Sequence, residues 1–311
     1  MIYVHHICFS DSILTDEVHT VKSRRNQAET VLYTLPCLAL VALTIYLPFV
    51  LSGYYSLTQW NGIAREPMFI GLGNYAELLR GDGSFMRALV FTGKYTIVSM
   101  VALNALALAL AVALVKDLKS RNVLRSVFFI PYILSMTIVG FIWQFIFSKG
   151  FDEFFKMTGF AFLNLSWLGD VKLVFYSVVF VGVWQAVGFY VVLYIAGLQS
   201  IPADIMEAAV MDGAHGLTKF FRITLPMITS SVVTCVLLSM INSLKVFDTI
   251  LALTKGGPAG STYSATLEIY REAFQNNNYG LGSAKSLVFF LIVLALTLFV
   301  LRAFRNREDA I

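Results

Sequence analysis

The sequence predicts an all-α integral membrane protein with six transmembrane helices. Of its 311 residues, 58% are hydrophobic and 14% are charged, and the mean hydropathy is +0.74. Soluble domains carry about 25% charged residues, so this chain has too little charge to cover a soluble surface. The second observation is a set of six long apolar runs, because a hydrocarbon layer about 30 Å thick takes roughly 20 residues of helix to cross.

The six runs give the predicted spans in chain order. Each is expected to be helical, since unpaired backbone N–H and C=O groups are costly in lipid. The spans are Val31–Leu51, Tyr95–Val115, Ser126–Ser148, Leu173–Leu198, Ile223–Leu244 and Ser286–Leu301. The first is too long for a cleaved signal peptide and lacks its small-residue cleavage pattern. The last is short, so we expect it to begin before Lys285, whose side chain can extend toward the membrane surface.

The Lys and Arg residues that flank these spans predict that both termini are cytoplasmic. The short segments Lys116–Arg125 and Arg302–Arg307 are densely basic, whereas Phe151–Asp170 mixes acids with one Lys. Residues 1–25 are then a cytoplasmic N-terminal tail, and residues 26–311 form the six-helix transmembrane domain. We interpret His5 and His6 as part of an irregular tail rather than a metal site.

Several kinds of chemistry are excluded by composition and spacing. The net charge of +4 gives no basic surface of the size that nucleic acid requires, and the three Cys have neither zinc-site spacing nor an even count. The segment Gly280–Ser286 is not a Walker loop, because Ala284 stands where Gly must precede the Lys. The span interiors are neutral, which argues against proton-driven transport. Lys245 and Asp248 are predicted to pair if the fifth helix continues past Leu244.

The loop between the fourth and fifth spans is predicted to contain a short helix. Pro202 suits a first helical position, Asp204 and Glu207 complement the positive end of the helix dipole, and Gly213 allows the chain to turn away. Ala208 and Ala209 make this helix thin, so that another backbone can approach it closely. An apolar loop outside the membrane indicates a groove in a partner protein.

The loop resembles the signature of ABC importer permease subunits. The spacing E-A-A, three residues, G, nine residues, I-x-L-P is met by Glu207, Ala208, Ala209, Gly213, Ile223, Leu225 and Pro226. Further segments match the carbohydrate-uptake branch, the MalF and UgpA type, in the family's order. These are Phe69–Tyr75, Arg125–Pro131, Leu198–Pro202, Phe247–Asp248 and Thr254–Pro258.

This resemblance implies the type I ABC importer permease fold, in the cytoplasmic (inner) membrane of a bacterium. Residues 199–226 would be the cytoplasmic coupling loop, with Glu207 as the charged contact, Asp212 beside it and Gly213 as the hinge. The implied partners are an ATPase dimer, a second permease of the MalG and UgpE type, and an extracytoplasmic solute-binding protein. ATP and Mg²⁺ would bind the ATPase, so the chain itself is expected to hold no cofactor and to be non-catalytic.

Sugars are recognised by a few placed polar groups together with aromatic rings. In similar permeases the fourth and fifth helices contact the solute, which implies a sugar or glycerol phosphate pathway here. The candidate residues are Trp184, Gln185, Phe189, Tyr190, Asn242, Ser243, Lys245, Phe247 and Asp248. Packing between helices is the alternative for each of the neutral ones. A secondary carrier for a small polar solute is the alternative for the whole chain, and a membrane enzyme lacks a recognisable site.

Overall fold

A computed structural model describes residues 31–81, 83–115 and 120–308, with side chains described to residue 304. The predicted tail, residues 1–25, and its two His lie outside the described residues, as do Lys116 and Lys119. The chain divides into two units, Met1–Tyr55 and Ser56–Ile311.

The described part of the first unit is a single apolar helix, Val31–Tyr55. It contains a π-helical turn, η1 (Ala42–Tyr46), and ends as α2 (Leu47–Tyr55). The Thr44 hydroxyl donates to the Leu40 carbonyl at 2.7 Å, so this polar side chain is paired within the helix. The helix is long enough to cross a bilayer and confirms the first predicted span.

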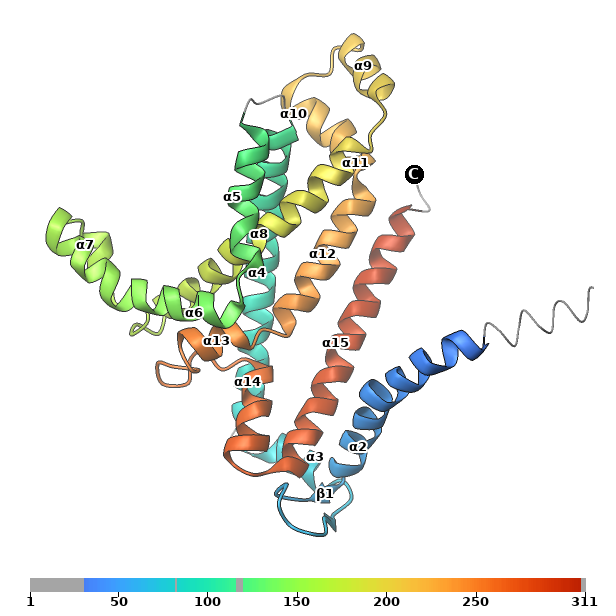
Figure 1. Cartoon of the computed structure of the whole chain (residues 1–311), viewed down its shortest axis with the longest axis vertical. Coiled ribbons are helices and arrows are strands. Elements are labelled where there is room, and N and C mark those ends of the chain that lie inside the picture. The colour runs from blue at the N-terminus through green and yellow to red at the C-terminus, as the bar shows by residue number, and fades with distance from the viewer. Residues whose placement is uncertain (1–30, 82, 116–119, 309–311) are drawn as a thin grey trace, which may run out of the picture. The chain divides into compact units, whose positions relative to one another are not determined.

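The second unit is organised around α8 (Leu173–Gln199). In its most apolar stretch 67% of the residues are buried, because three helices pack around it (Figure 1). These are α4 (Ser84–Val115), α5 (Arg121–Ile133) and α12 (Thr229–Leu244). A helix that is apolar on every face needs neighbours on every face. The approach of α5 is so close that a Cβ at Gly188 would overlap the carbonyl oxygen of Phe128. The second and fourth predicted spans are confirmed, although α4 begins at Ser84 rather than Tyr95.

The third predicted span is not one straight helix. After α5 the chain bends by 96° before a second helical stretch, Met136–Thr158. This stretch consists of α6 (Met136–Phe145), the π-helical turn η2 (Ile146–Gly150) and α7 (Phe151–Thr158). Leu134 and Ser135 are extended at the bend, and Pro131 lies one turn before it. Because proline lacks an N–H, it weakens the end of α5.

The fifth predicted span is also bent, by 75° between Gly216–Met227 and α12. The first stretch contains α10 (Gly216–Lys219), η4 (Phe220–Thr224) and α11 (Leu225–Met227), with Pro226 in α11. The sixth span is α15 (Tyr279–Glu308), which begins before Lys285 as expected. The described chain therefore holds four helices of spanning length and composition, or six when each bent pair is one span.

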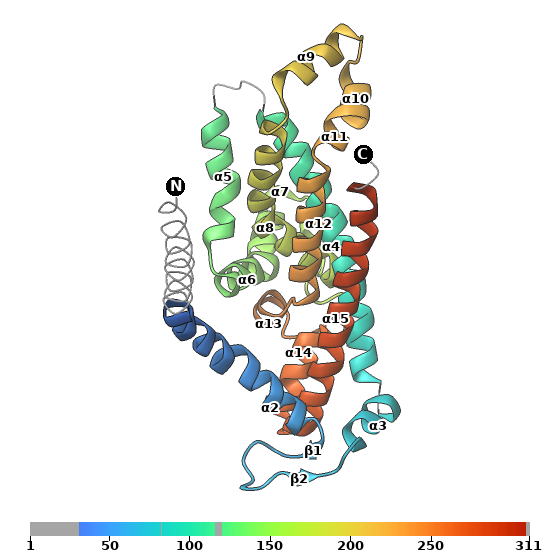
Figure 2. The same cartoon turned by 90° about the vertical axis from the view of Figure 1, so that its right-hand side faces the viewer.

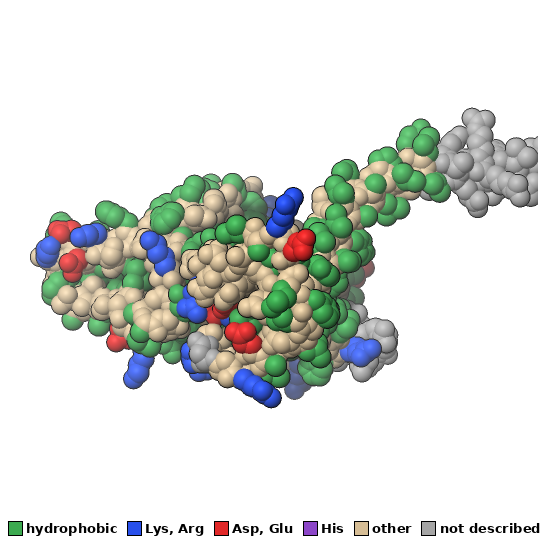
Figure 3. All heavy atoms as spheres, turned by 90° about the horizontal axis from the view of Figure 1, so that it is seen from below, with side chains coloured by type: hydrophobic (Ala, Val, Ile, Leu, Met, Phe, Trp, Pro, Cys, Tyr) green, Lys and Arg blue, Asp and Glu red, His purple; other side chains and the backbone are tan. Residues whose placement is uncertain are grey.

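Short elements gather at the end of the second unit opposite the loop that follows α8 (Figures 1 and 2). They are β1 (Thr58–Gln59) paired antiparallel with β2 (Met68–Phe69), α3 (Gly73–Arg80), α14 (Ala265–Tyr270) and η5 (Arg271–Gln275). Asn74 belongs to the segment Phe69–Tyr75 that resembles the carbohydrate-uptake permeases. It is 4% exposed and donates to the Ser56 and Thr58 carbonyls at 2.8 Å. On the face shown in Figure 3 the acidic and basic side chains are few and interspersed.

Two further short helices belong to the second unit. They are η3 (Ala161–Asn164), after α7, and α13 (Asp248–Leu253), after α12. A Cβ at Gly140 of α6 would lie 2.5 Å from the Cβ of Ala252, so α13 packs closely on α6. The predicted Lys245–Asp248 pair is wrong, because α12 ends at Leu244 and the described residues hold no ion pair between these two.

Candidate functional site

The loop between α8 and α12 holds the predicted short helix, α9 (Ala203–Met211), at one end of the second unit (Figure 1). Pro202 is the residue before the helix rather than its first member. Gly213 has φ +81° and Gly216 has φ +55°, so both occupy the left-handed region that glycine tolerates. The Ala214 N–H donates to the Ala209 carbonyl at 2.9 Å, which closes the turn after α9.

Most of α9 is open to its surroundings. Glu207 and Ala208 are exposed, whereas Ala209 is 6% exposed. Large apolar side chains are exposed on the same loop, among them Met211 at 86% and Leu217 at 76%. Lys219 donates from Nζ to the Met206 carbonyl at 3.1 Å and so ties α10 to α9. The loop thus presents a thin apolar helix with two exposed carboxylates, Asp204 and Glu207, held by its own hydrogen bonds.

The remaining signature residues connect α9 to the bundle. Asp212 is exposed at the end of α9, Ile223 and Leu225 are half-buried, and Pro226 is exposed in α11. An apolar cavity of about 820 Å³ lies beside them, lined by α4, the end of α8 and the residues from Gly216 to Leu225. The covalent route from α9 to α12 therefore passes through a short, bent helical stretch beside open volume.

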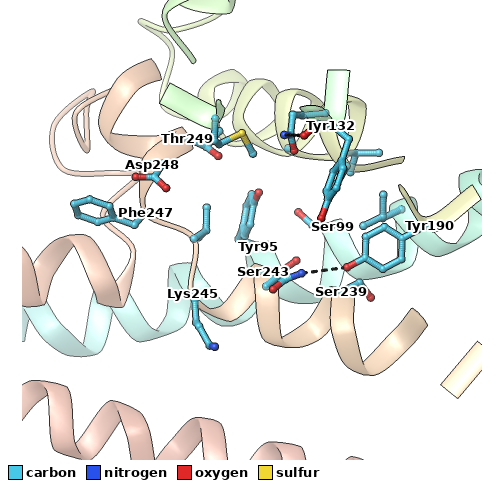
Figure 4. A pocket seen from close by; sticks show the side chains of 18 residues that line it. Tyr95, Ser99, Tyr132, Tyr190, Ser239, Ser243, Lys245, Phe247, Asp248 and Thr249 are labelled. Carbon is cyan, nitrogen blue, oxygen red and sulfur yellow. Dashed lines mark hydrogen bonds between the residues drawn. The ribbon is translucent and has the colours of Figure 1, made fainter. Parts of the chain in front are cut away.

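A second cavity, of about 240 Å³, lies in the middle of the second unit (Figure 4). Seven of the nine predicted pathway residues line it: Gln185, Tyr190, Asn242, Ser243, Lys245, Phe247 and Asp248. They come from α8, from the end of α12, from the break that follows it and from the first residue of α13. The polar and aromatic mixture at this break is the kind of lining that binds a hydroxylated solute.

The other two predicted residues lie outside the lining of this cavity. Trp184 packs edge-to-face on Trp143 at 5.4 Å between ring centroids. Phe189 stacks on Tyr132 at 4.8 Å, so it supports a ring that does line the cavity. Both side chains make aromatic packing contacts between helices.

Sequence reasoning missed the contribution of α4 and α5. Tyr95 and Ser99 of α4, Tyr132 of α5 and Ser239 of α12 line the same cavity. Tyr95 opens the predicted second span, and its polar ring among aliphatic residues was the available signal. Only the packing of α4 against α8 places it beside Gly182.

Two amide side chains fix the geometry of the lining. Asn242 donates from Nδ2 to the Tyr190 hydroxyl at 3.4 Å (Figure 4). Gln185 donates from Nε2 to the carbonyls of Tyr132 and Leu134, both at 3.4 Å. These carbonyls stand at the break between α5 and α6, so Gln185 covers groups that the bend leaves without helical partners.

A buried charged cluster was also missed. Lys285 is 4% exposed, and its Nζ lies 3.1 Å from Glu268 Oε1 and 2.7 Å from Glu272 Oε2. The expectation that Lys285 extends to the membrane surface is therefore wrong. Ser84 donates its hydroxyl to Glu268 at 2.8 Å, which joins α4 to α14 and α15. Burying these charges is tolerable because each has partners.

The cluster is balanced by a second cation. Arg271 lies 3.1 Å from Glu268 Oε2 and 4.8 Å above the Tyr263 ring. Burial disfavours the charged form of Glu272, but hydrogen bonds from Lys285 and Asn278 outweigh burial, and the pKa of Glu272 falls below its ordinary 4.5. Glu272 is therefore a carboxylate at neutral pH. Two acids and two bases give this cluster no net charge.

Comparison with known proteins decides the family. Residues 104–308, more than half of the chain, match the model for "Binding-protein-dependent transport system inner membrane component". The chain belongs to this family. It is accordingly a multi-pass component of the inner membrane and a permease subunit of the carbohydrate-uptake branch of ABC importers.

Two relatives and one solved structure illustrate the match. The permease is 36% identical over 256 residues to the multiple sugar-binding transport system permease protein MsmF of Streptococcus mutans, covering 82% of this chain and 88% of MsmF. It is 34% identical to the trehalose/maltose transport system permease protein MalF of Thermococcus litoralis, covering 89% and 94%. A bacterial ABC transporter for alginate import superposes with TM-score 0.80 at 19% identity, covering 93% and 99%, and shows the shared fold.

Proposed function

We propose that this permease is one half of the solute pathway of an ATP-driven sugar importer and is driven by a separate ATPase dimer that grips α9. A second, related permease supplies the other half, and an extracytoplasmic binding protein delivers the solute. The chain itself is non-catalytic, and ATP with Mg²⁺ binds the ATPase. The sugars in the names of MsmF and MalF support the solute class.

In this proposal residues 26–311 form the transmembrane domain, with both termini and α9 in the cytoplasm. The end that carries β1, α3 and α14 then faces outward, toward the binding protein. Asn74 and the charged cluster of α14 and α15 hold that end together.

The observation that carries the proposal is the exposure of α9 at the head of a continuous route to the solute cavity. From α9 the chain runs through α10, η4 and α11 into α12, whose last turn supplies Asn242 and Ser243 to the lining. A displacement of α9 can therefore reach the cavity along one covalent path of short, successive helical stretches. ATP shifts the access equilibrium only through its different affinity for the two ATPase arrangements, and α9 is the part of this chain that would sense that difference.

The test is co-purification of the ATPase with Glu207→Lys permease, together with ATP-dependent uptake into proteoliposomes. Reversing this exposed charge is expected to release the ATPase and abolish uptake while the permease still inserts. Glu77→Lys on α3 is the matched control, because it reverses another exposed Glu at the opposite end.

Three outcomes contradict the proposal. One is that Glu207→Lys keeps both the ATPase and transport. Another is that Glu77→Lys releases the ATPase equally. Uptake that persists without ATP but collapses with the proton gradient favours the secondary carrier.

A further inference from the structure

The solute cavity carries almost no charge. Among its lining residues, all of them described, the charged side chains are Lys245 and Asp248, one of each sign. Both are exposed, and in Figure 4 the Lys245 side chain extends away from Tyr95 and Tyr132. The rest of the lining is aromatic, aliphatic or neutral and polar. An anion in this cavity would therefore meet no cation of this chain that is directed at it among the described lining residues.

The neutral polar groups suit hydroxyls. Asn242 and Gln185 each use the amide N–H₂ in the described hydrogen bonds, which leaves Asn242 Oδ1 and Gln185 Oε1 as acceptors without partners among the described residues. Ser243 and Ser239 add hydroxyls that both donate and accept. Sugar hydroxyls can donate to such acceptors, whereas a phosphate or carboxylate at neutral pH cannot.

One wall of the cavity depends on a glycine. A Cβ at Gly182 of α8 would lie 2.5 Å from the Tyr95 hydroxyl oxygen, so only glycine lets this ring lie against α8. Tyr95 is 4% exposed and stacks on Phe91 at 6.2 Å between ring centroids. A larger residue at position 182 would displace the Tyr95 ring.

We propose that this cavity binds one uncharged sugar ring, walled by Tyr95 over Gly182, and discriminates against phosphorylated and acidic solutes. The inference rests on the proposed function, of which it names the solute class. At about 30 Å³ per water, a volume of 240 Å³ holds roughly eight waters, which is about the space of one sugar ring. A buried anion without a partner loses its hydration, so its binding is expected to be about 100-fold weaker or more.

The test measures binding to the assembled transporter, with its second permease and ATPase, in nanodiscs without the binding protein. Leaving out the binding protein makes the observed selectivity that of the membrane part. Saturation-transfer NMR compares three probes: maltotriose as a neutral saccharide, sn-glycerol 3-phosphate, and a galacturonate trimer. Maltotriose is expected to give ring-proton signals that the two anions do not compete away.

Variants locate the binding in this cavity. Gly182→Ala is expected to weaken maltotriose binding about ten-fold, because Tyr95 must move. Gly93→Ala on α4 is the matched control, since a Cβ there meets nothing within 4 Å, and binding should stay within about two-fold. Tyr95→Phe adds no bulk and is expected to weaken binding about three-fold through loss of one neutral hydrogen bond. This second variant keeps the test valid if Gly182→Ala fails to fold.

The outcomes separate this inference from the proposed function. Binding of either anion that is stronger than that of maltotriose and sensitive to Gly182→Ala overturns the inference and leaves ATP-driven import standing. Maltotriose binding that is indifferent to Gly182→Ala and Tyr95→Phe also overturns it, as does no binding of any probe. Selective maltotriose binding without ATP-dependent uptake overturns the proposed function alone.

Discussion

Replacing Lys285 by Met is expected to destabilise the end of the second unit that carries α14 and η5. The substitution keeps an unbranched side chain but removes the only cation that contacts both Glu268 and Glu272 in the described cluster. The side chains of Lys285, Glu268 and Glu272 are 5%, 1% and 9% exposed, respectively, so water cannot replace the lost ammonium. The cluster changes from no net charge to one uncompensated carboxylate.

Removing one partner of a buried ion pair costs about 3–5 kcal/mol. The lower end applies to Lys285→Met, because Arg271 still neutralises Glu268 and Asn278 still donates to Glu272 at 2.7 Å. About 3 kcal/mol corresponds to a fall of roughly 6–12 °C in the melting temperature of a unit of this size. Fluorescence-monitored melting of the detergent-solubilised permease measures it.

Lys156→Met is the control for this substitution. Its pair with Glu153 is equally short, at 2.7 Å, but the side chains are 62% and 70% exposed. No measurable change in melting temperature is expected, since water replaces the lost partner. Adding Glu272→Gln to Lys285→Met is expected to recover part of the loss. Equal melting temperatures for Lys285→Met and the wild type would refute the claim that the buried cluster stabilises the fold.

Three other predictions concern different parts of the chain. The pKa of Glu272 is lower in the folded state than its ordinary 4.5, so its carboxylate stabilises the fold fully only above pH 4.5. This stabilisation is expected to be lost as the pH falls from 4.5 through the folded-state pKa, and the melting temperature measured against pH tests this prediction. Gly188→Ala is expected to cost about 1–3 kcal/mol by forcing α5 from α8, and a melt no different from that of Gly93→Ala would contradict it. Gly213→Pro cannot adopt φ +81° and should abolish uptake while insertion continues; wild-type uptake rates would count against the hinge.

Hydropathy predicted the helices well where the chain crosses in one piece. The span at Leu173 begins where the uncharged run begins, because lipid forces the backbone of such a run into a helix. Hydropathy carried no information about the bends at Leu134–Ser135 and Ile228. At both places the residues remain uncharged, and a bend depends on which neighbouring groups pair the freed backbone.

The candidate sites divide in the same way. The α9 loop could be predicted because its Glu, Ala and Gly residues stand at fixed spacing within one short segment. The residues that line the 240 Å³ cavity were predicted in part to lie together, since seven of them fall in two short segments, one on α8 and one at the end of α12, whereas Tyr95 lies far away in sequence. The Lys285 cluster was missed because its acids lie between the fifth and sixth predicted spans, where hydropathy predicts no structure.

The side-chain amide of Gln185 lines the cavity and also donates its N–H groups to the carbonyls at the break between α5 and α6. A molecule in the cavity would compete with these carbonyls for the same N–H groups. A molecule that accepts hydrogen bonds from Gln185 Nε2 would leave the Tyr132 and Leu134 carbonyls without this donor. A guest rich in hydroxyls can return the donors it displaces, whereas an apolar guest cannot, and would have to leave Gln185 undisturbed. The break between α5 and α6 therefore favours guests that can donate hydrogen bonds to these carbonyls in place of the Gln185 amide.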